Sequence, residues 1–213
     1  MDLLKNIILT SRPKQQIKNI LVIIPFILSV NLWYALPSNL IINLLTNVLV
    51  GLVSFILGSW FIYIVNDYID RNVDKDHPEK SNKPIASNKI PQKLIMLVSA
   101  IILISSVSIG IIANSSFLFI LCIYISLMTL YSLIIKKVFL VDIISIAIGY
   151  MLRVYGGAII VVYSIDETIN VWNLDNVSAV NRLRELRLDL LVDLMGYTSV
   201  SYTHLTLPTK RIV

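Results

Sequence analysis

Long apolar runs separated by short polar segments make up most of the chain. Five runs approach the ~20 residues that an α-helix needs to cross ~30 Å of hydrocarbon. Backbone amides find no partner in lipid, so each run must be helical. The sequence therefore predicts an all-α fold, a polytopic transmembrane helical bundle. The expected spans are residues 20–35, 41–65, 94–113, 117–135 and 139–163, of which the first is the shortest.

The charge of the connecting segments alternates along the chain. Segments 36–40 and 114–116 carry no charged residue, whereas the N-terminal stretch, the loop at 66–93 and the pair Lys136-Lys137 are rich in basic residues. Basic residues near the ends of spans stay on the cytoplasmic side. We therefore expect an integral, multi-pass protein of the cell membrane whose N-terminus and 66–93 loop are cytoplasmic.

Composition agrees with a membrane solvent. Apolar residues make up 56% of the chain and charged residues only 15%, and the mean hydropathy is +0.79. The net charge of +5 comes from basic residues that cluster between the apolar runs. Topology and phosphate binding explain this charge better than nucleic acid does, so membrane lipids are expected partners and nucleic acid is not. The single cysteine, Cys122, excludes a disulfide within the chain.

A cluster of acidic residues follows the second apolar run. If the helix continues beyond residue 65, Asp67, Asp70 and Asp74 lie on one face at i, i+3 and i+7, with Asn66 beside them. Like charges on one helix face repel one another unless a cation lies among them. Hard oxygen ligands suit Mg²⁺, which takes one or two carboxylates and completes its shell with water and substrate phosphates.

Basic residues follow the aspartates in the same loop, among them Lys80 and Lys83. Carboxylates that bind a metal, beside lysines that bind phosphate, form a site for Mg²⁺ and a diphosphate. The alternative is a solvated acidic helix end, whose charge is balanced by Arg71 and Lys75.

The segment Asn66-Asp67-x-x-Asp70-x-x-x-Asp74 resembles the signature of the UbiA superfamily of membrane prenyltransferases. The resemblance implies a nine-helix fold, in which this motif ends the second helix. It also implies that Asp67, Asp70 and Asp74 are catalytic and bind Mg²⁺, and that Asn66 contacts a diphosphate substrate.

The stretch Lys83-Pro84-Ile85-Ala86-Ser87 also resembles the family pattern, with lysine in place of the usual arginine. Asn88 stands where the family has glycine. Both residue types tolerate a left-handed turn, so the departure from the family pattern is mild.

Two further stretches resemble the decaprenyl-phosphate phosphoribosyltransferases of this superfamily. They are His77-Pro78-Glu79-Lys80 and the segment 12–19, which precedes the first span. The resemblance implies transfer of phosphoribose from phosphoribosyl diphosphate to a polyprenyl phosphate. It adds Lys80, Lys14 and Lys18 to the expected substrate-binding residues, beside Lys83.

The fifth span contains an arginine, Arg153, well inside the apolar run. A cation at this depth costs at least ~2.5 kcal/mol unless it faces the bundle interior and finds a partner. A guanidinium suits a phosphate bidentately, so we expect Arg153 to bind substrate. An intramembrane ion pair or a side chain that snorkels to the surface is the alternative. Asp142, three turns away, reads as a surface residue or a partner of Lys136.

The chain divides by character into a transmembrane domain at 1–167 and an atypical tail at 168–213. No run in the tail is long and apolar enough to span a membrane, and residues 200–213 resemble a translated sequencing adapter. Only about five of the nine helices that the resemblance implies are present, so we expect a chain that is truncated at its C-terminus. A non-native origin is one interpretation of its atypical tail.

Three functions remain open from the sequence. The first is Mg²⁺-dependent phosphoribosyl transfer to a polyprenyl phosphate. The second is prenyl transfer from a polyprenyl diphosphate to an aromatic or other acceptor, which uses the same aspartates. The third is a non-enzymatic polytopic membrane protein or an inactive fragment.

Overall fold

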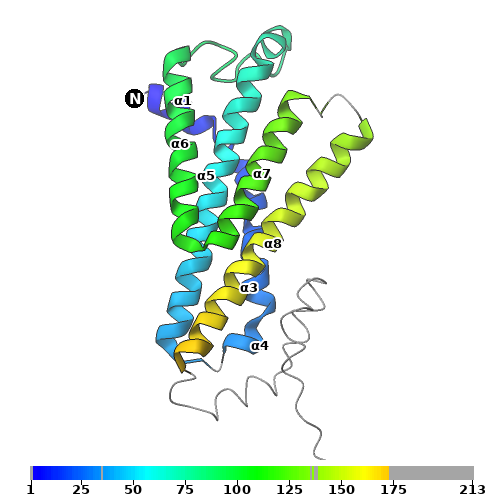
Figure 1. Ribbon diagram of the computed structural model, residues 1–213. Coiled ribbons are helices and arrows are strands. Elements are labelled where there is room, and N and C mark those ends of the chain that lie inside the picture. Colours follow the sequence, from blue (N-terminus) through cyan, green and yellow to red (C-terminus); the bar gives the residue numbers. More distant parts are fainter. Residues whose placement is uncertain (1, 35, 135, 137–138, 173–213) are drawn as a thin grey trace, which may run out of the picture.

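The computed structural model describes residues 2–34, 36–134, 136 and 139–172, which are helical apart from the loop at 77–91 and short turns (Figure 1). Its four long helices are α5 (Ser38–Asp76), α6 (Gln92–Ala113), α7 (Ser115–Leu133) and α8 (Phe139–Trp172). Each is long and apolar enough to cross a membrane. The predicted all-α transmembrane bundle is thereby confirmed. Most of the predicted tail lies outside the described residues, and its first residues continue α8.

The first predicted span is not one continuous helix. After α1 (Asp2–Leu9) the chain forms four short pieces: α2 (Pro13–Gln16), η1 (Ile17–Val22), α3 (Ile24–Leu28) and α4 (Val30–Trp33). This irregular path still runs from the end of the bundle near α1 to the opposite end, with η1 and α3 packed against α8 (Figure 1).

Local chemistry explains the interruptions between these short pieces. Pro25 has no amide hydrogen to donate to the turn before it. The Ser29 hydroxyl donates to the carbonyl of Phe26 at 3.1 Å, a bond that bends helices. The prediction of a single helix over residues 20–35 was therefore wrong, because this segment is divided into short helical pieces.

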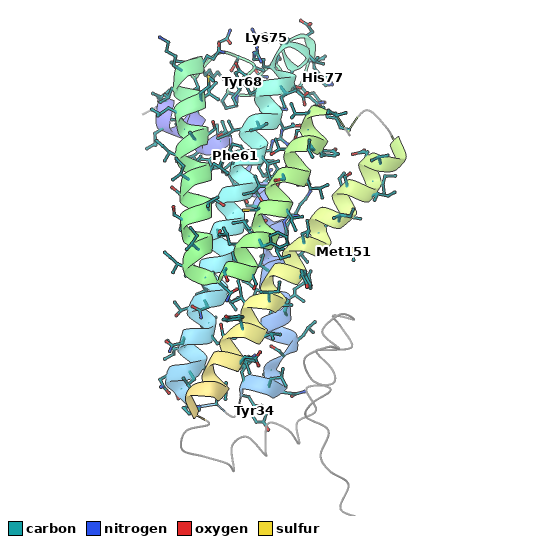
Figure 2. The ribbon with its side chains drawn as sticks, in the orientation of Figure 1. Tyr34, Phe61, Tyr68, Lys75, His77 and Met151 are labelled. Carbon is teal, nitrogen blue, oxygen red and sulfur yellow. The ribbon has the colours of Figure 1, made fainter. Side chains whose placement is uncertain are left out.

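The chain reverses direction at each turn, so the basic segments gather at one end. In Figure 1, α1, the end of α5 and the start of α6 lie together, and the turn at Asn114 lies toward the other end. Figure 2 shows Tyr68, Lys75 and His77 at the basic end and Tyr34 at the opposite one. This arrangement matches the alternation expected from the charges.

A close approach joins α5 to α6. The hydroxyl of Ser54 donates to the carbonyl of Ser106 at 2.7 Å, and the hydroxyl of Ser106 donates to the carbonyl of Ser54 at 2.8 Å. Gly58 and Gly110, each one turn from a serine of this pair, leave room for the contact. Small residues that let two helix backbones approach are typical of membrane bundles.

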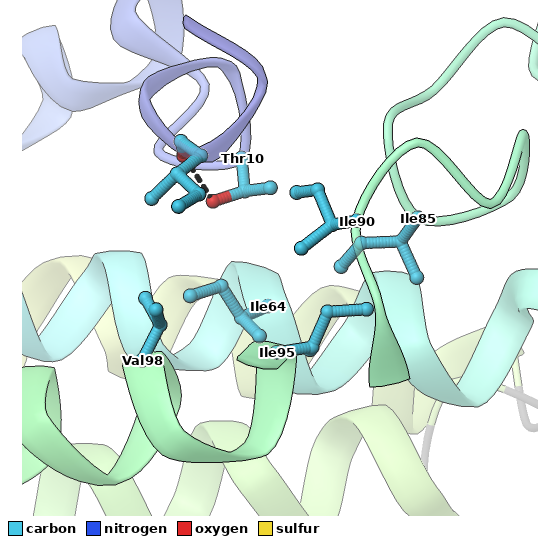
Figure 3. A pocket seen from close by; sticks show the side chains of 7 residues that line it. Thr10, Ile64, Ile85, Ile90, Ile95 and Val98 are labelled. Carbon is cyan, nitrogen blue, oxygen red and sulfur yellow. Dashed lines mark hydrogen bonds between the residues drawn. The ribbon is translucent and has the colours of Figure 1, made fainter. Parts of the chain in front are cut away.

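A second apolar cluster anchors the loop after α5. Ile85 and Ile90 of the loop are buried against Ile64 of α5 and Ile95 of α6. Figure 3 shows a small cavity among these side chains, close to α1. Its lining is apolar except for Thr10, whose hydroxyl donates to the carbonyl of Ile7. The cluster holds the loop on the bundle and thereby places Lys83 beside α5.

Candidate functional site

The acidic motif lies on a continuous helix, because α5 extends beyond the expected span to Asp76. Asp67 and Asp74 are each only 4% exposed, and Asp70 is half-buried. A buried carboxylate needs a charged or hydrogen-bonding partner. The partners of the three aspartates therefore define the site.

Lys83 bridges two of the aspartates. Its Nζ lies 2.9 Å from Oδ1 of Asp67 and 2.7 Å from Oδ2 of Asp74. Burial by itself lowers the pKa of Lys83, but the hydrogen bonds to Asp74 and Asp67 outweigh it and raise the pKa above its ordinary value of 10.5. Lys83 is therefore a firmly charged ammonium between two carboxylates.

Arg12, from the N-terminal segment, is a further member of the site. Its Nη2 lies 2.5 Å from Oδ1 of Asp67, and its guanidinium lies over the ring of Tyr63 at 5.2 Å from the centroid. The backbone of Arg12 is left-handed, with φ 50°. This conformation is uncommon for residues other than glycine and clusters at functional sites.

Arg12 was not among the substrate-binding residues expected from the sequence. Lys14 and Lys18 of the same segment were, because the resemblance covers the stretch without ranking its residues. The structure leaves both lysines exposed, and neither pairs with the aspartates among the described residues. The ammonium of Lys18 lies 5.6 Å from the ring centroid of Tyr150.

Asp70 is separated from the other two aspartates. Three residues along a helix rotate a side chain ~60° away from the line that Asp67 and Asp74 share. Asp70 accordingly pairs with Lys136, whose Nζ is 2.5 Å from its Oδ1. The suggestion that Lys136 pairs with Asp142 is not what the structure shows.

In the described part of the chain, no three or more His, Cys, Asp or Glu side chains gather closely enough to hold a metal by themselves. The donor set nevertheless fits Mg²⁺ of the kind that completes its shell with substrate phosphates. Asp67 and Asp74 offer two hard oxygens that already converge on one cation, the ammonium of Lys83. Asp70 and the half-buried Asn66 lie on adjoining turns of α5.

Lys80 does not reach this cluster. It is exposed in the turn after α5, and no ion pair involves it among the described residues. His77 belongs to the same turn, where its Nδ1 accepts a hydrogen bond from the amide of Glu79 at 3.2 Å. Asn88 adopts a left-handed conformation, with φ 55°, which asparagine tolerates as glycine does.

Arg153 lies deeper in the bundle and is 5% exposed. Figure 2 shows Met151, two residues earlier, on the outer side of α8, so Arg153 faces inward. Its Nε donates to Oδ1 of Asn19 at 2.8 Å, Nη1 to the carbonyl of Gly149 at 2.7 Å and Nη2 to the hydroxyl of Tyr124 at 2.6 Å.

All three acceptors are neutral, and no carboxylate of the described residues lies within 4.0 Å of the guanidinium. Neither alternative from the sequence, an ion pair or a snorkelling side chain, describes Arg153. It is a buried cation whose charge is not cancelled, with N–H groups left for a further acceptor. An anion is the partner that such a group favours.

The chain is similar to several curated proteins that are named decaprenyl-phosphate phosphoribosyltransferase. The one from Mycobacterium tuberculosis is 23% identical over 158 residues, which are 74% of this chain and 51% of the relative. That from Mycolicibacterium smegmatis is 25% identical over 74% of this chain and 49% of the relative. That from Corynebacterium glutamicum is 29% identical over 70% of this chain and 44% of the relative. The chain thus spans about half the length of the curated relatives it matches.

A solved structure supports the same fold. It comes from work on digeranylgeranylglyceryl phosphate synthase in membranes, and it aligns with a TM-score of 0.65 at 21% identity over 78% of this chain and 57% of that one. The model of the UbiA prenyltransferase family matches residues 22–175, which is more than half of the chain. On this match, the chain belongs to the UbiA prenyltransferase family.

Proposed function

We propose that the chain carries the diphosphate-binding half of a membrane transferase, which moves 5-phosphoribose from phosphoribosyl diphosphate to a polyprenyl phosphate in a Mg²⁺-dependent reaction. The observation that carries the proposal is the convergence of Asp67 and Asp74 on one cation, with Arg12 at the same carboxylate. The names of the curated relatives support this reaction over others of the family.

In this reaction an oxygen of the lipid phosphate attacks C1 of the ribose. The bond from C1 to the diphosphate oxygen breaks, and the diphosphate leaves with the bonding electrons. A phosphate monoester is mostly a dianion at pH 7, so the acceptor needs no base to remove a proton. The protein's task is therefore to bind and neutralise charge.

Each group of the site has a part in that task. Asp67 and Asp74, with Asp70 and Asn66 beside them, would hold Mg²⁺, which when bound neutralises the charge that develops on the diphosphate. Arg12 and Lys83 exchange their carboxylate partners for diphosphate oxygens, since charge-assisted hydrogen bonds favour phosphate. Lys80, Lys14 and Lys18 would attract an anionic substrate as exposed positive charges.

Arg153 has a separate part. Its buried guanidinium, whose hydrogen-bond acceptors are neutral, would bind the phosphate of the lipid acceptor. The polyprenyl tail would then lie along the apolar helices, and bilayer lipids would contact their outer faces. The basic end of the bundle faces the cytoplasm in this proposal, as the positive-inside rule favours.

Prenyl transfer from a polyprenyl diphosphate is the second candidate, because the family name and the structural neighbour both point to it. The same carboxylates and cations would bind that diphosphate. Only the donor and the acceptor differ, so a substrate assay separates the two reactions.

The test is an assay of membranes that contain the protein, with radiolabelled phosphoribosyl diphosphate, polyprenyl phosphate and Mg²⁺. Asp67→Asn should abolish labelled lipid while the protein still inserts into the membrane. Asp76→Asn, an exposed aspartate at the end of the same helix, is the matched control and should leave activity unchanged.

Because the chain spans half of its relatives, the full gene from the same source is assayed in parallel. Labelled lipid from the full-length protein alone would support the reaction and assign the remaining part of the machinery to the rest of the gene. An active Asp67→Asn protein, or no labelled lipid from either form, would refute phosphoribosyl transfer at this site. Prenyl diphosphate would be the next donor to test.

A further inference from the structure

Asn19 lies at the centre of a buried polar network and is 0% exposed. Its Oδ1 accepts hydrogen bonds from Nε of Arg153 at 2.8 Å and from the hydroxyl of Ser59 at 3.0 Å. Its Nδ2 donates to Oε1 of Gln16 at 2.6 Å. One side chain of the irregular N-terminal segment thereby holds groups from α5, α8 and its own segment.

The network continues from Asn19 toward the aspartates. Nε2 of Gln16 donates to the carbonyl of Ser11 at 2.9 Å, and the next residue is Arg12 with its left-handed backbone. A hydrogen bond that fixes the carbonyl before a strained residue stabilises that conformation. Asn19 is thus linked to Arg12 through Gln16 and Ser11, while it touches Arg153 directly.

One face of α5 runs beside this network. Ser59, Tyr63 and Asp67 follow at four-residue spacing, so they share a face that rises about 12 Å over two turns. Ser59 meets Asn19, Tyr63 lies under Arg12, and Asp67 binds Arg12. The two arginines therefore lie beside the same face of α5 at two heights. Arg12 is at the upper level, and Arg153 is at the lower level with Asn19.

We propose that Asn19 is a positioning residue that places both arginines for anionic substrate groups, which deepens the proposed function and rests on it. Its amide carbonyl orients Arg153 without cancelling the positive charge, which a carboxylate in the same place would do. Its amide nitrogen supports Arg12 through Gln16. The competing explanation is that Asn19 only satisfies buried polar groups of the core.

The test uses two probes on the detergent-solubilised chain. Inorganic diphosphate with Mg²⁺ reports on the upper level, and farnesyl monophosphate, a short polyprenyl phosphate, reports on the lower level. Asn19→Asp keeps the shape, adds a carboxylate beside Arg153 and removes the donor to Gln16. The Kd of farnesyl monophosphate should rise about tenfold or more, since a charge-assisted hydrogen bond is lost. The unfolding temperature should not fall, because Arg153 gains an ion pair.

Ser59→Ala is the matched control, since it removes hydrogen bonds of the same network, to Asn19 Oδ1 and to the hydroxyl of Tyr124, without adding a charge. It should lower the unfolding temperature slightly and leave both Kd values within about twofold. If Ser59→Ala weakens binding as much as Asn19→Asp does, or if affinity and stability fall together in Asn19→Asp, the effect is loosened packing and the positioning role is wrong.

Gln16→Ala tests the link to Arg12 independently, and it decides the matter if Asn19→Asp does not fold. It should raise the Kd of Mg²⁺-diphosphate and leave that of farnesyl monophosphate unchanged. A Kd of Mg²⁺-diphosphate equal to that of the wild type would overturn the link. Wild-type binding of both probes with no change in Asn19→Asp would overturn only the role of Asn19. A wild-type chain that binds neither probe would overturn the proposed function and this inference with it.

Discussion

The guanidinium of Arg12 lies 2.5 Å from a carboxylate oxygen of Asp67, although 55 positions separate the two residues. The contact ties the N-terminal segment to the end of α5. It also means that the acidic motif is matched by cations of the chain itself, Arg12 and Lys83, which are available to an anionic ligand.

Arg12→Ala should therefore weaken the binding of Mg²⁺-diphosphate. The loss of one charge-assisted hydrogen bond corresponds to about a 10- to 100-fold rise in Kd. Isothermal titration of the solubilised chain measures it. Lys5→Ala, an exposed cation of α1 that makes no ion pair among the described residues, is the control and should change the Kd less than about threefold. Equal effects of the two substitutions would contradict a direct role for Arg12.

The raised pKa of Lys83 predicts that the stability of the protein falls at alkaline pH. Its pKa in the folded protein lies above the ordinary value of 10.5, so its contribution is fully present below the unfolded pKa and is lost as the pH rises through the folded pKa. The unfolding temperature of the metal-free chain should fall above about pH 10. Lys83→Met should show a smaller fall, whereas Lys89→Met, which is exposed in the same loop, should follow the wild type. If the unfolding temperatures of the wild type and Lys83→Met fall equally with rising pH, the ion pairs of Lys83 make no such contribution to stability.

Gly157→Ala should destabilise the protein, although alanine is the better helix former by about 1 kcal/mol. A Cβ at this position would overlap the backbone carbonyl of Val22, and a backbone atom cannot move aside cheaply. We expect a net loss of about 1–3 kcal/mol, measured by thermal or denaturant unfolding in detergent. In the same helix, Gly149→Ala meets first the flexible end of Met128 at 3.1 Å and should be close to neutral. A stable Gly157→Ala protein would mean that η1 does not pack on α8 as described.

The reciprocal serine pair between α5 and α6 predicts a small loss of stability when one of its hydroxyls is removed. Ser106→Ala removes the hydroxyl that donates to Ser54 and should cost about 0.5–1 kcal/mol. Ser99→Ala is the matched control on the same helix, because its hydroxyl is exposed and donates only to Met96 of its own helix. Unfolding of the two variants in one detergent compares them. A larger loss for Ser99→Ala would show that the contact between the helices contributes little.

The long helices could be predicted from the sequence because length and apolar character suffice for them. Spans expected at 41–65, 94–113, 117–135 and 139–163 correspond to α5, α6, α7 and α8. The left-handed backbone at Asn88 agrees with the view that asparagine is a mild replacement for the glycine of the family pattern, since this depends on a local preference of the residue. The break at Pro25 was not predicted, because the apolar run continues through the proline without a change in composition.

The partners of the acidic residues could not be predicted, because contacts between distant segments leave no trace in local spacing. Three aspartates on one face suggested a single cluster, but helix rotation directs Asp70 to Lys136 and leaves Asp67 and Asp74 with Lys83. Likewise, the contact of Arg12 with Asp67 could not be predicted, because it depends on the N-terminal segment folding back over α5.

The irregular path of the N-terminal segment has a consequence for how the protein enters the membrane. Asn19 leaves the ribosome early, but Ser59 follows 40 positions later and Arg153 134 positions later. A buried amide without its partners is costly in lipid, so η1 cannot settle in its final place until α8 has been synthesised. The segment that precedes α5 therefore completes its contacts only after α8 has been made, and until then its polar side chains need water or other polar groups around them.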